Sequence, residues 1–303
     1  GNIATDRGTP YVHKETKAPR DKFGDGVNNS KTPIWKYDYV TKNYALCSSY
    51  GDLTAVENHR WDLTWVSEKD GSICFFINPS YSAEQLLKFF KDDPDKIIDD
   101  IVRQRPYYKD PNKWIEGSPY EKLLQHENTI IALYDIPKKE RNGHVNGFFS
   151  KIIEQRVEED GWIFCRSDSI YFAVKTLSRG KWHEQIDHFR LTLNNRKTGL
   201  IMEVAQVSEF PSFAAFKSKI KSNPLKIDRK KLHVVYTNSR GDQLDFTYSD
   251  QRFINGKKID FNDWGLFEGP CVHAKRGSKI FEIQYGREKV VLDFNRFEAR
   301  FDK

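Results

Sequence analysis

The sequence predicts a mainly β protein, an antiparallel β-sandwich of the large supersandwich type with a few short helices. From residue 34 onward, short apolar runs alternate with tight turns rich in Gly, Asn and Asp. The chain also holds 7 Trp, 14 Tyr and 21 Phe residues, an aromatic content typical of strands. No strand–helix alternation of the βαβ kind is visible. Many short strands joined by short turns fold as antiparallel sheets that pack face to face.

The first part of the chain differs from the rest and defines the expected domain boundary. Residues 1–31 hold six glycines and prolines, many charges and almost no apolar periodicity. Such a composition is typical of an extended arm or linker. We therefore expect an arm over residues 1–33 and the β-sandwich over residues 34–303.

The strands of the first two thirds are predicted from apolar runs on either side of turns. One hairpin is expected where Glu-Lys-Asp-Gly separates residues 60–66 from residues 72–77. The run Ile-Ile-Ala-Leu-Tyr within residues 128–136 predicts a strand that is buried on both faces. Further strands are expected at residues 161–165, 170–177, 188–193 and 200–207.

The last third repeats this pattern at short intervals. Asn255-Gly256, within residues 252–259, is the strongest hairpin turn in the sequence. Other strands are expected at residues 232–237, 243–248, 272–275, 279–285 and 289–294. Helices are expected only after the Ser82/Gln85 capping box, around residues 97–102, and at residues 211–220.

Composition and charge exclude several classes of protein. The chain has 49 basic and 43 acidic residues, and a net charge of +6 is too balanced for a dedicated nucleic-acid binder. No apolar run approaches the roughly 20 residues that a membrane-spanning helix needs. The four cysteines lack CxxC spacing, so structural thiols are expected. Met202 is the only methionine, so we expect Gly1 to arise by processing or truncation.

Two histidines have neighbours that suit catalysis. His59 stands between Asn58 and Arg60 at the start of a predicted strand, and His126 precedes the buried strand. A histidine can move a proton while an arginine and amides neutralise a carboxylate beside it. We therefore expect His59 and His126 to be catalytic, with Asn58 and Arg60 binding substrate. The alternative is that each histidine only caps its strand, and the sequence leaves both open.

A basic and aromatic stretch lies between these two histidines. Arg105, Tyr107 and Trp114 combine cationic and flat side chains, which suits a groove for an acidic polysaccharide. The alternative is that these side chains belong to loops that pack over a sheet.

Three phrases resemble the β-sheet region of heparinase II/III-like polysaccharide lyases. They are Glu57-Asn-His-Arg-Trp61, Gln125-His-Glu-Asn128 with residues 131–137, and Gly161-Trp-Ile-Phe164. The resemblance spans residues 35 to 295 and implies β-elimination on a uronic-acid glycan by a secreted or periplasmic protein. It places the sheet region's histidine at His59, with His126 as the second choice.

The resemblance also implies features that this chain lacks. In the family a helical (α/α) toroid precedes the sheets and supplies much of the active site, and no toroid is visible here. An upstream toroid domain is therefore an expected partner, together with an acidic polysaccharide. Some family members carry a metal, but no third ligand joins His59 and His126, so cofactor and metal stay unknown. The competing hypothesis is a non-catalytic module that binds glycan or packs against a catalytic domain.

Overall fold

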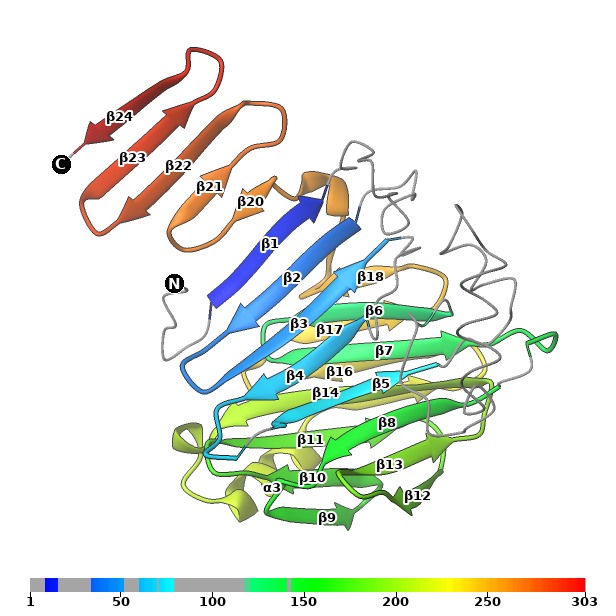
Figure 1. The fold of residues 1–303 in the computed structure, drawn as a ribbon. Coiled ribbons are helices and arrows are strands. Elements are labelled where there is room, and N and C mark those ends of the chain that lie inside the picture. Colours follow the sequence, from blue (N-terminus) through cyan, green and yellow to red (C-terminus); the bar gives the residue numbers. More distant parts are fainter. Residues whose placement is uncertain are drawn as a thin grey trace, which may run out of the picture.

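The structure, a computed structural model, describes residues 9–15, 34–51, 60–69, 71–78, 118, 120–140 and 143–302. Within these ranges 24 strands form three antiparallel sheets of thirteen, six and five strands (Figure 1). The predicted class is confirmed: the protein is mainly β and its sheets stack as in a sandwich.

The thirteen-stranded sheet forms one outer layer. Its first eight strands are ordered β12-β13-β8-β5-β4-β3-β2-β1, and strands β20 to β24 continue it beyond β1. The bounds of the first eight are β12 Gly180–Glu184, β13 His188–Leu193, β8 Val145–Ser150, β5 Ile73–Ile77, β4 Trp61–Trp65, β3 Tyr44–Tyr50, β2 Ile34–Val40 and β1 Thr9–Glu15. Strand β1 lies within the predicted arm, and it pairs with β2 on one side and with β20 on the other.

The six-stranded sheet is the middle layer and is buried on both faces. In β7, Ile130 and Ala132 pack toward the thirteen-stranded sheet, whereas Ile131 and Leu133 pack toward the third layer. This explains the unbroken apolar run in the sequence, because both sides of the strand exclude water. The strands in order are β6 Glu121–His126, β7 Thr129–Asp135, β14 Lys197–Gln206, β11 Ile170–Thr176, β10 Trp162–Arg166 and β9 Gln155–Glu159.

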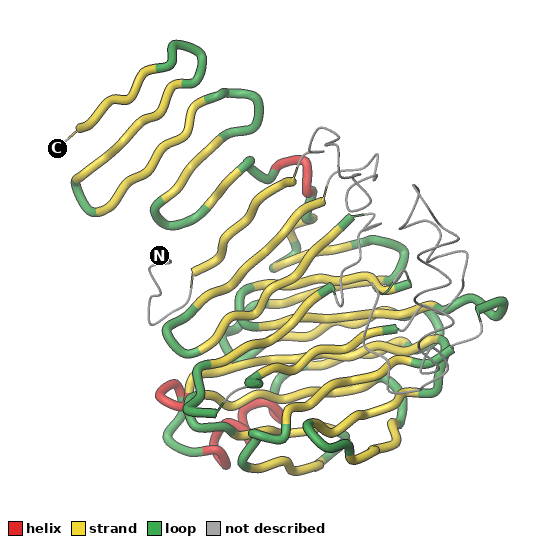
Figure 2. The backbone as a smooth tube through the Cα atoms, in the orientation of Figure 1, coloured by secondary structure: helices red, strands yellow, loops and turns green. Residues whose placement is uncertain are grey.

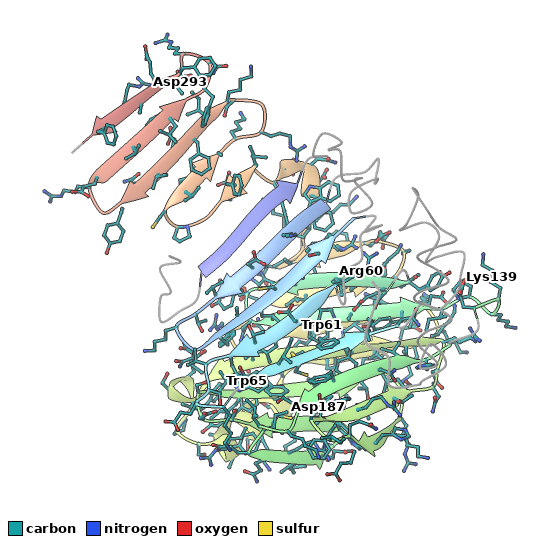
Figure 3. The ribbon with its side chains drawn as sticks, in the orientation of Figure 1. Arg60, Trp61, Trp65, Lys139, Asp187 and Asp293 are labelled. Carbon is teal, nitrogen blue, oxygen red and sulfur yellow. The ribbon has the colours of Figure 1, made fainter. Side chains whose placement is uncertain are left out.

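Two tryptophans of β4 attach the outer sheet to the middle one (Figure 3). Trp61 Nε1 donates a hydrogen bond to Glu121 of β6, and Trp65 Nε1 donates one to Ser167 after β10. Both rings are buried in the core between the sheets. Each indole therefore combines apolar burial with a satisfied N–H group.

The five-stranded sheet and helix α3 cover the other face of the middle sheet. Helix α3, Phe213–Ser222, agrees with the helix expected at residues 211–220: the Ser212 hydroxyl caps it, and three apolar side chains on one face are buried. The two other predicted helices lie outside the described residues. The remaining elements are the 3-10 helices Val207–Glu209 and Phe261–Asp263 and the strands β15 Leu225–Asp228, β16 His233–Thr237, β17 Gln243–Thr247, β18 Arg252–Ile254 and β19 Lys257–Lys258.

Local turn chemistry correctly identified several hairpins. Asn255 and Gly256 join β18 to β19, and both have positive φ, 51° and 75°, as a type I′ turn requires. The predicted hairpin β4–β5 also forms, and the expected strands β10 and β11, and β16 and β17, pair across short turns. In contrast, the turn after β13 leads into a different layer, because β13 belongs to the outer sheet and β14 to the middle sheet.

The last five strands extend away from the other two sheets as a single layer (Figures 1 and 2). They are β20 Phe267–Glu268, β21 Val272–Ala274, β22 Ile280–Tyr285, β23 Glu288–Asp293 and β24 Glu298–Asp302. Large apolar side chains here are exposed, with Tyr285 at 65% and Phe301 at 74%. In the part of the chain that the structure describes, no helix is long and apolar enough to cross a membrane.

Candidate functional site

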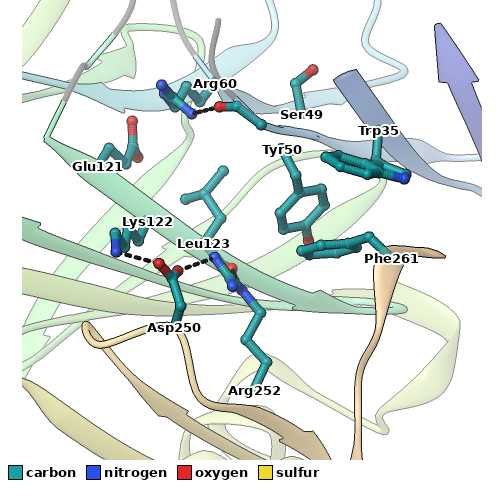
Figure 4. A pocket seen from close by; sticks show the side chains of 11 residues that line it. Trp35, Ser49, Tyr50, Arg60, Glu121, Lys122, Leu123, Asp250, Arg252 and Phe261 are labelled. Carbon is teal, nitrogen blue, oxygen red and sulfur yellow. Dashed lines mark hydrogen bonds and ion pairs between the residues drawn. The ribbon is translucent and has the colours of Figure 1, made fainter. Parts of the chain in front are cut away.

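A cavity of about 340 Å³ opens beside the start of β6 (Figure 4). Side chains from β2, β3, β6, β18 and the 3-10 helix Phe261–Asp263 line it, so all three layers contribute. Its described lining consists of three cations, two acids, three aromatic residues and a few small or apolar residues. These charged and aromatic groups decide which ligand the cavity can hold.

Arg60 supplies the first cation, and its guanidinium is held in place by the backbone. Nε donates to the carbonyl of Ser118 at 2.9 Å, and Nη1 donates to the carbonyl of Gly51 at 3.0 Å. Arg60 directly precedes the first residue of β4, so the start of that strand fixes the position of the guanidinium at the cavity wall.

The other two cations share one carboxylate on the opposite wall. Asp250 pairs with Lys122 and with Arg252, whose Nη2 lies 2.9 Å from Oδ1. Arg252 Nε also donates to the Leu123 carbonyl at 2.8 Å. Two cations thus share a single exposed carboxylate, which leaves this pair of side chains with a net positive charge.

Aromatic rings form the remaining wall. The Tyr50 and Phe261 centroids lie 4.7 Å apart, and Trp35 lies 5.4 Å from Phe261. The Arg252 guanidinium lies 5.2 Å from the Phe261 centroid, within cation–π range. Rings beside cations suit a ligand with both a flat apolar face and a negative charge.

Glu121 is the buried acid of the cavity wall. Its Oε1 accepts hydrogen bonds from Trp61 Nε1 at 2.8 Å and from the Tyr134 hydroxyl at 2.6 Å. Its Oε2 has no hydrogen-bond partner among the described residues. Burial raises the pKa of this carboxyl to about 7, and the Tyr134 hydrogen bond and the charge of Arg60 only partly oppose that increase.

Of the residues that the sequence predicted for the site, Arg60 lines the cavity. His59, Asn58, Arg105, Tyr107 and Trp114 lie outside the described residues. Whether they belong to the site stays a prediction.

His126 lies away from this cavity. It ends β6, five residues after Glu121, so the strand separates the two by about 17 Å. Its Nε2 is 3.5 Å from Asp242 Oδ2, next to the ion pair between Arg240 and Glu127. Arg60, which donates to the Ser118 carbonyl before β6, and His126 therefore lie near opposite ends of this strand.

The described residues contain no group of three or more His, Cys, Asp or Glu side chains that could hold a metal. Cys74 and Cys165 are buried free thiols, and burial raises the pKa of both, which fits their expected structural role.

Sequence analysis missed Glu121, Lys122 and Arg252. Glu121 and Lys122 begin a strand that the sequence analysis did not predict, and Arg252 lies 130 residues after Lys122 in the chain. The available signal was Glu121 itself, an acid two residues before the apolar pair Leu123 and Leu124.

The fold and the cavity define a class, an antiparallel β protein of stacked sheets with a cationic, aromatic-walled cavity at the junction of its layers. Comparisons with models of protein families, with curated proteins and with solved structures gave no match.

Proposed function

We propose that this chain is the sheet region of a carbohydrate-active protein, a polysaccharide lyase that cleaves uronic-acid glycans, and that the cavity binds an acidic sugar. The observation that carries the proposal is the lining: Lys122 and Arg252 pair with the exposed Asp250 carboxylate, Arg60 lies on the opposite wall, and aromatic rings form the wall beside them. Cations can pair with a uronate carboxylate or a sulfate while a sugar ring packs on the aromatic side chains.

In the proposed reaction the cavity neutralises the uronate carboxylate. A base removes the proton from the carbon next to that carboxylate, the electron pair forms a carbon–carbon double bond, and the bond to the leaving oxygen breaks as that oxygen gains a proton. Neutralising the carboxylate makes the first proton transfer easier, because negative charge develops on it. His59 directly precedes Arg60 in the sequence and remains our proposed base.

The proposal includes the wider setting that the family resemblance implies. The protein would act in the periplasm or outside the cell, where acidic polysaccharides are met, and an upstream helical toroid would complete the active site. His126, which is paired with Asp242 away from the cavity, has no catalytic part in this scheme.

A second candidate function is glycan binding without catalysis. It is favoured by the way two cations are already used: Arg60 donates to two backbone carbonyls, and Arg252 donates to a third. Such arginines hold the layers together, and their guanidinium groups keep the positive charge with which they can bind an anion without transferring a proton.

The test is a comparison of binding and turnover on a panel of acidic and neutral polysaccharides. Calorimetry measures affinity, and the ultraviolet absorbance of the unsaturated uronate product measures elimination. A lyase yields that product, and a binding module shows affinity alone. The absence of both with every acidic polysaccharide would disprove the proposal.

A matched pair of variants tests the cavity itself. Lys122→Met removes a cavity cation, whereas Lys139→Met removes the same charge from the exposed turn after β7 (Figure 3). We expect Lys122→Met to weaken binding of acidic oligosaccharide about tenfold, as the loss of one charge-assisted contact predicts. Lys139→Met should bind like the wild type, and equal losses in both variants would place the ligand elsewhere.

A further inference from the structure

We propose that Glu121 sets the charge of the cavity, so that binding of an anionic ligand is coupled to uptake of a proton by this carboxyl group. The inference rests on the proposed acidic-sugar site and adds its regulation: the site would hold its ligand tightly at weakly acidic pH and release it at weakly alkaline pH.

The hydrogen bonds of Glu121 leave one oxygen available for that proton. Trp61 and Tyr134 both donate to Oε1, and Oε2 has no partner among the described residues although the side chain is 3% exposed. A proton on Oε2 therefore breaks no hydrogen bond. Ionisation, in contrast, puts a negative charge on a carboxyl group that water does not reach, and this burial outweighs the hydrogen bonds from Tyr134, Ser118 and Trp61 that favour the charged form.

Charged and phenolic side chains surround Glu121 on several elements. Arg60 faces it from the start of β4, and Lys122, Arg252 and Asp250 lie on the cavity walls. Tyr134 on β7 and Tyr50 on β3 stay neutral, because burial raises the pKa of both phenols.

Glu121 is a group of the described lining whose charge changes between pH 6 and pH 8. Burial raises its pKa to about 7, so at pH 6 this carboxyl group is mostly protonated and adds little negative charge to the cavity. At pH 8 a second carboxylate is present and opposes the positive potential around Arg60. The attraction for an anionic ligand falls accordingly.

Thermodynamic linkage gives the reverse effect with equal size. If the proton strengthens anion binding, then a bound anion must raise the pKa of Glu121. At pH 7, where the carboxyl is about half ionised, binding should take up a fraction of a proton from the buffer. Calorimetry in two buffers with different enthalpies of ionisation measures that uptake directly.

The experiment compares the affinity for an acidic oligosaccharide at pH 6 and pH 8. We expect the wild type to bind about tenfold more weakly at pH 8, a change within the usual range for coupled sites. Glu121→Gln keeps an uncharged side chain of the same shape, so its affinity should not change with pH and it should take up no proton. Glu288→Gln, an exposed substitution on β23, should behave like the wild type.

A second measurement separates this inference from the proposed function. The Glu121 titration is followed by carboxyl-carbon NMR with and without sulfate, a plain anion. If the oligosaccharide binds but wild type and Glu121→Gln share one pH profile, the inference is wrong and the function stands. If the oligosaccharide fails to bind but sulfate raises the Glu121 pKa, the glycan proposal is wrong and the coupled anion site stands. If the oligosaccharide fails to bind and sulfate leaves the Glu121 titration unchanged, both are wrong.

Discussion

At the scale of single residues, Glu121 joins the two largest layers at one point. Its Oε1 receives Trp61 from β4 of the outer sheet and Tyr134 from β7 of the middle sheet. The indole N–H of Trp61 and the hydroxyl of Tyr134 are buried, and Glu121 gives each of them a hydrogen-bond acceptor. The same burial makes the ionised form of Glu121 unfavourable, so the junction is strongest when the carboxyl is protonated.

This arrangement predicts a pH-dependent gain in stability for Glu121→Gln. Because burial raises the pKa of Glu121 from its usual 4.5 to about 7, folded wild type binds the proton more tightly than the unfolded chain. The stabilisation is full below pH 4.5 and is lost as pH rises toward 7. Glutamine escapes that loss, so at pH 8 the variant should be more stable than wild type by up to about 3 kcal/mol.

Denaturant unfolding at pH 4 and pH 8 checks this, with Glu288→Gln as the exposed control. The two stabilities should converge at pH 4, where wild-type Glu121 is protonated in both states. An equal difference between wild type and Glu121→Gln at both pH values would show that ionisation of Glu121 does not control the stability of the junction.

Sequence reasoning reached part of the site at this scale. Arg60 was predicted because it stands beside His59 in a polar cluster at a strand start. Glu121 and Arg252 were not predicted, because their roles come from hydrogen bonds to groups 13 to 129 residues away in the sequence. A local pattern reports which face of a strand is buried, but it does not report which distant groups share that face.

At the scale of elements, the turn between β16 and β17 fastens the three layers at the other end of β6. Arg240 extends from this turn, pairs with Glu127 at 2.8 Å and with Glu209 at 3.0 Å, and donates to the Tyr39 hydroxyl of β2. Its side chain is 18% exposed, so these contacts are partly protected from water.

We expect Arg240→Met to destabilise the protein by about 3 kcal/mol, because it leaves Glu127 and Glu209 partly buried without their cation. Arg287→Met, in the exposed turn between β22 and β23, is the matched control and should change stability by less than about 0.5 kcal/mol. Chemical denaturation measures both. If the two variants lose the same stability, the Arg240 contacts do not hold the layers together.

Which strands pair was predictable only where a short turn joins them. Asn255-Gly256 specified the β18–β19 hairpin because both residues accept positive φ. The pairings β5–β8, β7–β14 and β1–β20 join strands far apart in sequence. The first two lie within layers that bury apolar faces against each other, and those faces favour the pairing. Turn residues cannot predict such a pairing, because no short turn joins the two strands.

At the scale of the whole molecule, two parts of the outer sheet differ in how they are supported. The half from β12 to β2 packs on the middle sheet, and its side chains belong to the main core. The part from β20 to β24 has few buried side chains, among them Ala274 and Val291. The 3-10 helix at Phe261–Asp263 and Trp264 mark the boundary, since both Phe261 and Trp264 pack against Tyr50 at the edge of the core.

This difference predicts two levels of protection in amide hydrogen exchange. Amides of β7, β11 and β14 lie in a sheet covered on both faces, so they should exchange only through global unfolding. Amides of β22, β23 and β24 are held mainly by their own ladder, so local opening should release them at least tenfold faster. Exchange followed by mass spectrometry resolves the two sets of peptides. Equal protection would mean that the outer strands unfold together with the core, and their exposed aromatic face would then have to be stabilised as firmly as the buried layers.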